Sequence, residues 1–191
     1  MTKDELSRVG LALAKEFIKE NDLGNPSIKL HDVPNKYSNC GLYRYGVKRI
    51  DVWIPSCARQ NSRYSFPGLF CDRTPYGVIN HELGHHVEEE LGNGSARKIR
   101  KLSGEERLTS YCPDSSEWFA EMMRLFITNP DLLSKIRPKT YDAILSYGVR
   151  PVVNLGYKEV LQKFNASDYV LGRADKKIEE ASQAIARAKA V

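Results

Sequence analysis

The feature that most constrains this chain is the segment His81-Glu82-Leu83-Gly84-His85, which has the spacing H-E-x-x-H. On an α-helix, residues four positions apart lie about 40° from each other around the axis, so both imidazoles point to one side. Two neutral imidazoles on one helical face can hold Zn²⁺ at about 2.0–2.1 Å. Glu82 cannot be a third ligand at that spacing, but it can accept a proton from metal-bound water. The motif therefore predicts metal-assisted hydrolysis, provided that it lies on a helix.

The flanking residues predict such a helix over residues 75–91. Thr74-Pro75 supplies an N-cap residue followed by proline at the first helical position. Gly92-Asn93-Gly94 ends a run of apolar residues at helical spacing: Val78, Ile79, Leu83, Val87 and Leu91. Gly84 in mid-helix costs about 1 kcal/mol relative to alanine. We therefore expect another backbone or side chain to crowd that surface of the helix.

A second segment offers a third protein ligand. The run over residues 118–127 is apolar almost all round, so the helix that it predicts is buried. Asp114 caps this helix and Asn129-Pro130 ends it. Glu117 and Glu121 lie four apart on one face, where they would be costly to bury as free charges. A metal ion explains both, with Glu117 as the ligand and Glu121 orienting a ligating imidazole.

Each of these interpretations has a structural alternative. The H-E-x-x-H helix could carry two surface histidines and a solvated glutamate. Glu117 and Glu121 could instead pair with arginines such as Arg124. We favour the metal site because the two segments together supply a complete set of three ligands and a base.

Four elements, in this order along the chain, resemble the catalytic domain of anthrax lethal factor and small related metallopeptidases, including ones encoded by bacteriophages. They are His81 to His85, Leu108 to Tyr111, Glu117 to Glu121, and Arg-Pro-Lys-Thr-Tyr at 137–141. The resemblance covers about residues 75–145 and implies a gluzincin-type zincin. Carried over, it implies that zinc is bound by three residues, His81, His85 and Glu117. It also implies that Glu82 is the general base and that Tyr111 stabilises the oxyanion. An ordinary loop tyrosine is the alternative for Tyr111.

Two functional classes follow. The favoured one is a zinc-dependent endopeptidase that hydrolyses peptide bonds in a protein or peptide, with Glu82 as the base. The other is a virion-associated structural or assembly protein of a bacteriophage that retains a metallopeptidase site. A nucleic-acid binder is a third, disfavoured class, and its binding would fall steeply with salt.

Composition agrees with a small enzyme. A chain of 191 residues suits one domain with a sizeable core. The net charge of +5 would suit an acidic partner, but the basic residues are scattered except for the cluster at residues 97–101. On a helix such a cluster is more often a solvated face than a phosphate-binding patch, so we do not expect nucleic acid as a partner.

The expected location is the cytoplasm, including that of a phage-infected host, or a virion. The first residues do not open a signal peptide, and no apolar run approaches the length of a membrane span. Cysteines at positions 40, 57, 71 and 112 show no C-x-x-C spacing, and reduced thiols are expected. Cys112 is expected to be a packed free thiol.

The fold expected from these patterns is α+β and zincin-like, with a small mixed or antiparallel sheet over the motif helix and a mostly helical C-terminal half. An amphipathic helix is predicted over residues 2–20. Strands are predicted over 27–33 and 41–55. In zincins an edge strand commonly pairs with an extended substrate, and residues 49–54 are the candidate here. The alternative is that they form an interior strand.

Residues 1–150 are expected to form the zincin-like metallopeptidase domain, and residues 151–191 a helical C-terminal extension. Short helices are predicted near 131–136, 139–147 and 157–164, with a final helix over 173–190. The apolar stripe of the final helix is too narrow for a core helix, so it packs weakly on the body or docks on a partner. Substrate-binding side chains would come from the loops at 56–74 and 92–113, and the sequence assigns none of them.

Overall fold

The structure is a computed structural model, and it describes residues 1–60, 62, 64–110 and 114–189. Within these ranges the chain forms eight α-helices, a short 3₁₀ helix and one three-stranded mixed sheet. The predicted α+β class, with its small sheet and mostly helical C-terminal half, is confirmed.

The helices in chain order are α1 (Lys3–Glu20), α2 (Pro75–Leu91), α3 (Ser95–Ser103), α4 (Ser115–Thr128), α5 (Pro130–Ile136), α6 (Pro138–Ser146), α7 (Tyr157–Gln162) and α8 (Asp168–Lys189). The strands are β1 (Ser27–His31), β2 (Gly41–Arg44) and β3 (Arg49–Trp53), and the 3₁₀ helix η1 (Ile54–Ser56) follows β3. Helix α2 has its predicted bounds. Helix α8 begins five residues before its predicted start at residue 173.

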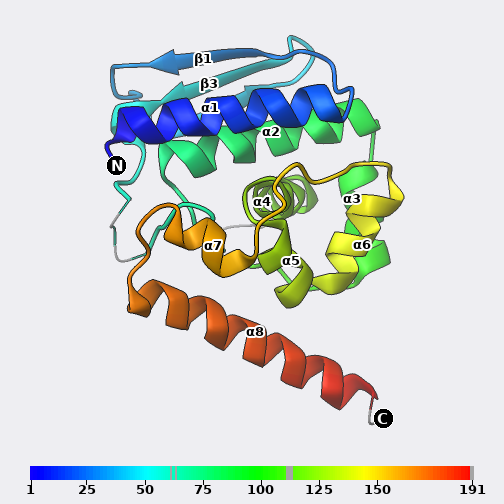
Figure 1. Cartoon of the computed structure of the whole chain (residues 1–191). Helices are drawn as coiled ribbons and strands as arrows, with labels where there is room; N and C mark the ends of the chain where they lie inside the picture. The colour runs from blue at the N-terminus through cyan, green and yellow to red at the C-terminus, as the bar shows by residue number, and fades with distance from the viewer. Residues whose placement is uncertain (61, 63, 111–113, 190–191) are drawn as a thin grey trace.

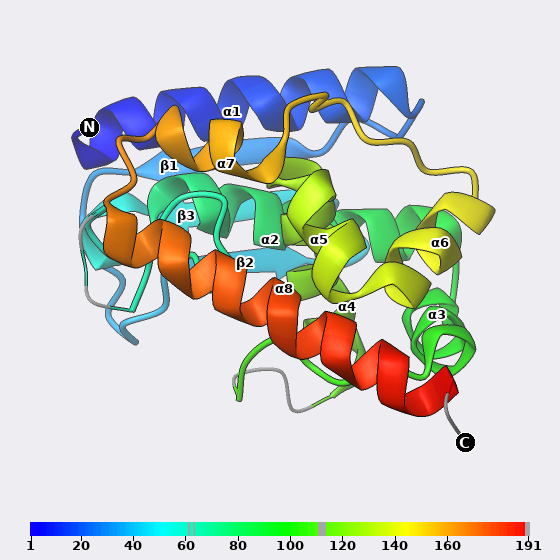
Figure 2. The same cartoon turned by 60° about the horizontal axis from the view of Figure 1, so that its bottom comes forward.

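These elements form layers (Figure 1). The sheet lies at one side of the molecule, and α1 and α2 run side by side under one of its faces. Helix α4 packs beneath α2, and α3, α5, α6 and α7 surround it. Helix α8 lies on the side opposite the sheet, where it crosses α5 (Figure 2).

The strand order is β1-β3-β2, with β1 parallel and β2 antiparallel to β3. β3 is therefore the central strand, and the prediction that residues 49–54 form an edge strand for substrate is wrong. The interior alternative is correct, because a hairpin turn over residues 45–48 folds β2 back onto β3. Gly46 in this turn has φ 77°, a left-handed conformation that glycine adopts without strain. The edges of the sheet are β1 and β2.

Side-chain caps fix where the main helices begin. The Thr2 hydroxyl accepts a hydrogen bond from the Glu5 backbone N–H at 3.2 Å, and the Glu5 carboxylate accepts one from the Thr2 N–H at 2.7 Å. This is the predicted capping box of α1. Thr74 caps α2 ahead of Pro75, and the Asp114 carboxylate caps α4. The start of both candidate-site helices is thus set by their own sequence.

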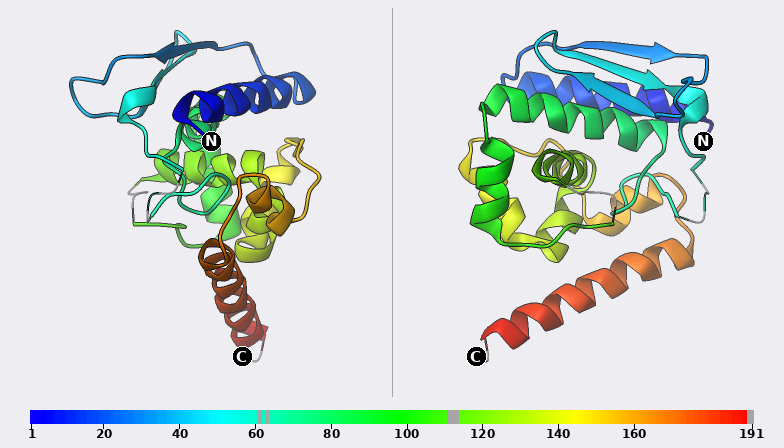
Figure 3. Two further views of the ribbon diagram at one scale, coloured as in Figure 1. Left: turned by 60° about the vertical axis from the view of Figure 1, so that its left-hand side comes forward. Right: turned by 180° about the vertical axis from the view of Figure 1, so that it is seen from behind.

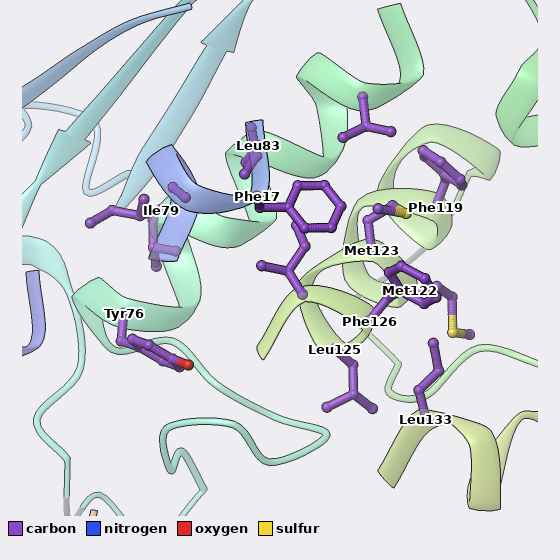
Figure 4. Close-up of a cluster of buried hydrophobic side chains, with 14 of the residues drawn as sticks. Phe17, Tyr76, Ile79, Leu83, Phe119, Met122, Met123, Leu125, Phe126 and Leu133 are labelled. Atoms are coloured by element: carbon purple, nitrogen blue, oxygen red, sulfur yellow. The ribbon is translucent and has the colours of Figure 1, made fainter. Parts of the chain in front are cut away.

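The core lies where α2 meets α4 (Figure 4). Figure 4 shows Phe17 of α1 between Ile79 and Leu83 of α2 on one side and the apolar side chains of α4 on the other. The fully buried members of α4 include Trp118, Phe119, Met122, Met123, Leu125, Phe126 and Ile127. Burial of a helix on nearly all sides, as its composition predicts, leaves α4 no freedom to shift relative to α2.

Gly84 is the point of closest approach between these helices. A Cβ atom on Gly84 would lie 2.7 Å from Ala120 Cα and 2.9 Å from Ala120 O. The expectation that another backbone crowds this glycine is therefore confirmed.

The C-terminal segment packs on the rest of the chain through α5, which contacts both α7 and α8. Ala174 of α8 is fully buried, whereas Ile185 is 37% exposed. The last turns of α8 project away from the body (Figure 3). Among the described helices, none has the length and apolar character needed to cross a membrane. Cys40, Cys57 and Cys71 are free thiols.

On the sheet, Asp51 of β3 is a buried carboxylate with three donors. It accepts hydrogen bonds from Arg44 Nε at 2.7 Å and Arg49 Nε at 3.0 Å, and its other oxygen lies 2.9 Å from His31 Nε2. Burial alone would raise the pKa of this carboxyl, but the bonds from Arg44, His31 and Arg49 outweigh it and lower the pKa to about 2.

Substitution of Gly84 by alanine is expected to destabilise the protein. Alanine gains up to about 1 kcal/mol of helix propensity, but its Cβ collides with the Ala120 backbone. We expect a net loss of about 1–3 kcal/mol in the free energy of unfolding, measured by urea denaturation. The matched control is Gly172→Ala on α8, where the added Cβ has open space and should stabilise. A Gly84→Ala protein as stable as wild type would contradict the close approach.

Acid should weaken the sheet through Asp51. Because the folded-state pKa of this carboxyl lies below its unfolded value, its contribution is present above about pH 4 and is lost as the pH falls toward 2. We expect the free energy of unfolding to fall more steeply between pH 4 and pH 2 in wild type than in Asp51→Asn. Equal slopes for the two proteins would refute this assignment.

Candidate metal centre

Three predicted ligands converge between α2 and α4. His81 and His85 come from α2, Glu117 comes from the first turn of α4, and one ligand atom from each lies within 4.8 Å of the others. His81 Nε2 is 3.2 Å from Glu117 Oε2, and His85 Nε2 is 3.5 Å from Glu117 Oε1. The structure thus brings Glu117 to two histidines that lie at least 32 residues before it in the chain.

These separations fit a metal ion. In a tetrahedral site with bonds of about 2.0–2.1 Å, neighbouring ligand atoms lie about 3.3 Å apart. The separation of His81 Nε2 and Glu117 Oε2 is close to that value, and His85 Nε2 lies at a similar distance from the other carboxylate oxygen, Oε1. Within the described residues, Glu117 Oε2 is also a buried oxygen without a hydrogen-bond partner, although His81 Nε2 lies near it. A cation among the three side chains would satisfy this oxygen, so the group can hold a metal ion.

A buried series of hydrogen-bonded polar groups holds the ring of His81 through its Nδ1 atom. Its Nδ1 lies 2.8 Å from Glu121 Oε1, and Glu121 Oε2 accepts hydrogen bonds from Arg124 Nε and Nη2 at 3.0 and 2.9 Å. A proton on Nδ1 leaves the Nε2 lone pair for a metal. Glu121 therefore makes the contact predicted for orienting an imidazole and, at the same time, the alternative contact with arginine.

Arg124 connects these hydrogen-bonded side chains to the loop before α2. It is fully buried and donates to the carbonyl oxygens of Leu69 and Phe70 at 2.9 and 3.0 Å. A buried guanidinium needs all of its donors matched, and one carboxylate and two carbonyls supply the acceptors. The loop before α2 thereby fixes the position of Glu121.

The ring of His85 has a different set of partners. Its Nδ1 lies 3.1 Å from Ser116 Oγ and 3.0 Å from the hydroxyl of Tyr45. Both hydroxyls contact Glu88 Oε2, Ser116 at 2.5 Å and Tyr45 at 3.2 Å. The sequence analysis missed Tyr45, Glu88 and Ser116. Two of them could have been found from their positions in the sequence. Glu88 lies one turn after His85, and Ser116 lies directly before Glu117.

Glu82 lies on the sheet side of the site. Its side chain is buried against the start of β2, where a Cβ on Gly41 would collide with Glu82 Oε1 and lie 2.8 Å from its Cγ. Burial raises the pKa of Glu82, against the attraction of His81 and His85, which lowers it. A carboxylate with a raised pKa is better suited to accept a proton than a solvated one.

Charges within the site are strongly coupled. Contacts with Glu117 and Glu121 outweigh burial and raise the pKa of His81 to about 10. The reciprocal contacts with His81 and His85 hold the pKa of Glu117 well below its usual range. Protons and a divalent cation therefore compete for the same nitrogen atoms.

Two predicted positions cannot be compared with the structure. Tyr111, predicted to stabilise the oxyanion, and Cys112, predicted to be a packed thiol, both lie outside the described residues. In comparisons with known proteins, no family model, curated protein or solved structure matches this chain. Its functional interpretation therefore rests on the site itself.

Removal of the carboxylate behind His81 should weaken metal binding. We expect Glu121→Gln to bind a divalent metal about 10–100-fold more weakly, because the amide supports the imidazole less well. Competition with a chromogenic chelator measures the affinity. Glu16→Gln, the same substitution on the exposed face of α1, is the control and should bind as wild type does. Unchanged affinity in Glu121→Gln would show that His81 needs no such support.

Proposed function

We propose that this protein is a zinc-dependent endopeptidase of the gluzincin type with a zincin-like fold. The observation that carries the proposal is the convergence of His81, His85 and Glu117. The buried carboxylate of Glu82 lies close enough for its charge to interact with all three side chains. Support also comes from the arrangement of a motif helix under a small sheet, with the third ligand on a second buried helix.

The ligand set favours zinc in a catalytic role. Two imidazoles and one carboxylate are a usual set for catalytic zinc, and three protein ligands leave one position for water or substrate. His81, His85 and Glu117 would hold the ion. When bound, it supplies a Lewis acid and lowers the pKa of a water molecule toward about 7.

Glu82 moves the proton in the proposed reaction. It accepts a proton from the attacking water and then passes this proton to the leaving nitrogen of the peptide. Its burial against β2 suits both steps, because a carboxylate in a poorly solvated place holds a proton more readily. Tyr111 remains the proposed donor to the oxyanion. The reaction needs no covalent bond between the chain and the substrate.

The open edge of the sheet suggests how a substrate binds. β2, rather than residues 49–54, presents an unpaired edge, and its first residue, Gly41, packs against Glu82. An extended peptide that pairs with β2 would run past Glu82, held by backbone hydrogen bonds. The missing side chain at Gly41 leaves room for this carboxylate beneath the strand.

Replacement of Glu82 separates the base from the ligands. We expect Glu82→Gln to lower turnover about 10²–10⁴-fold, because the amide cannot accept the proton. Zinc content should stay at one ion per chain. Digestion of casein, followed by gel electrophoresis, and elemental analysis of the purified proteins measure the two properties.

Glu16→Gln serves as the matched control and should cleave casein as wild type does. Wild-type protein that retains its activity after zinc is removed by a chelator would refute a metallopeptidase. Full activity in Glu82→Gln would refute the role of this residue.

A further inference from the structure

The outer face of the sheet carries an unusual pair of charges. All the described helices lie on the other side of the sheet, so this face is open (Figures 1 and 3). Arg44 of β2 and Arg49 of β3 are directly opposite each other in the register. Like charges at such positions destabilise a sheet. A carboxylate is therefore needed to offset the repulsion between the two arginines.

Asp51 offsets only part of this charge. A single oxygen, Oδ2, accepts the Nε–H groups of both Arg44 and Arg49, while Oδ1 contacts His31. Across the described chain, Asp51 is the one carboxylate that forms an ion pair with either arginine. Two guanidinium groups thus share one negative charge, and an excess positive charge remains.

Both arginines are held in place yet remain accessible. The side chain of Arg44 is 42% exposed and that of Arg49 is 34% exposed, whereas that of Asp51 is 2% exposed. Asp51 holds each guanidinium through Nε, and within the described residues no hydrogen bond or ion pair engages the Nη groups. Lys29 on β1, opposite Asp51 in the register, adds a further exposed positive charge.

A hollow of about 650 Å³ opens beside the two arginines. It is lined by Ser27, Leu42, Tyr43, Arg44, Val47 and Arg49. Leu42 and Val47 are 37% and 67% exposed, so the hollow offers apolar surface next to the positive charge. This combination suits an acidic side chain carried on a peptide.

We propose that Arg44 and Arg49 bind a carboxylate side chain of the protein substrate and make the enzyme select acidic segments. The proposal rests on the endopeptidase function proposed above. A guanidinium fork binds a carboxylate through two parallel hydrogen bonds, which gives both charge and geometry.

The position of Arg44 on β2 limits how far the acidic residue can lie from the cleaved bond. Side chains alternate between faces along a strand, so Leu42 and Arg44 point outward, whereas Tyr43 is buried on the inner side. A peptide paired with β2 places its own outward side chains beside them. Arg44 is three residues from Gly41, the residue next to Glu82, which corresponds to about 10 Å along the strand. Because Tyr45, the next residue, reaches His85, the acidic residue should lie within about three residues of the cleaved bond.

Cleavage of a peptide library tests this selection. A proteome-derived peptide mixture is digested, and the products are sequenced by mass spectrometry. Wild type should show roughly tenfold enrichment of Asp and Glu at one position near the cleaved bond, the effect of one charged hydrogen-bonded pair. Arg44→Gln should lose the enrichment among the peptides that it still cleaves. Arg97→Gln removes one exposed positive charge from α3 and should retain the enrichment.

Glutamine at position 44 can still donate to Asp51, and thermal unfolding checks that the variant folds. If it does not fold, Arg44→Lys keeps the charge next to Asp51 but lacks the fork, and it should lose most of the enrichment. Cleavage without acidic enrichment in wild type would overturn this proposal and leave the peptidase function standing. Absence of any zinc-dependent cleavage would overturn both.

A binding measurement separates an acidic peptide from other anions. The Glu82→Gln protein is titrated into a fluorescein-labelled decapeptide of alternating Gly and Glu, and into the Gly-Gln counterpart. The acidic peptide should bind roughly tenfold more tightly, and Arg44→Gln should remove the difference. Tighter, Arg44-dependent binding of a labelled oligo-dT would instead indicate a nucleic-acid surface and overturn the proposal.

Discussion

The close approach of α2 and α4 at Gly84 and Ala120 determines the rest of this structure. Gly84 lies between His81 and His85 on one helix, and Ala120 lies between Glu117 and Glu121 on the other. The contact is thus at the centre of the candidate metal site, between His81 and His85 on one side and Glu117 and Glu121 on the other. A larger residue at either position would separate the helices and lengthen the distances from Glu117 to the two histidines. Gly84 lowers the helix propensity of α2, but its lack of a side chain lets the two helices come close enough to form the site.

The site also depends on charges that are costly to bury. His81, Glu121 and Arg124 are buried together, and such a network stabilises only when each member is matched. The hydrogen bonds that satisfy this network extend beyond the two helices, because Arg124 donates to the carbonyl oxygens of Leu69 and Phe70. The long loop before α2 is therefore part of the support of the metal centre, rather than a mere connection.

The sequence predicted the parts of the fold that local signals control. Caps and stops predicted the bounds of α2. The motif spacing and the carboxylates on a buried helix predicted that His81, His85 and Glu117 come together, as they do. Strand order depends on pairing between distant segments, and residues 49–54 were wrongly placed at an edge for that reason. Tyr45 was missed because a hairpin turn, not a periodic pattern, brings its hydroxyl to His85.

Arg44, at the end of β2, also bears on the association of two molecules of this protein. An unprotected edge strand is a template for pairing with the same strand of another copy. Two copies of β2 brought edge to edge would each bring the uncompensated charge of the Arg44 and Arg49 pair, and the two would repel. On the proposed role of these arginines, the same charge would favour an acidic foreign chain at this edge and disfavour pairing of the sheet with its own copy.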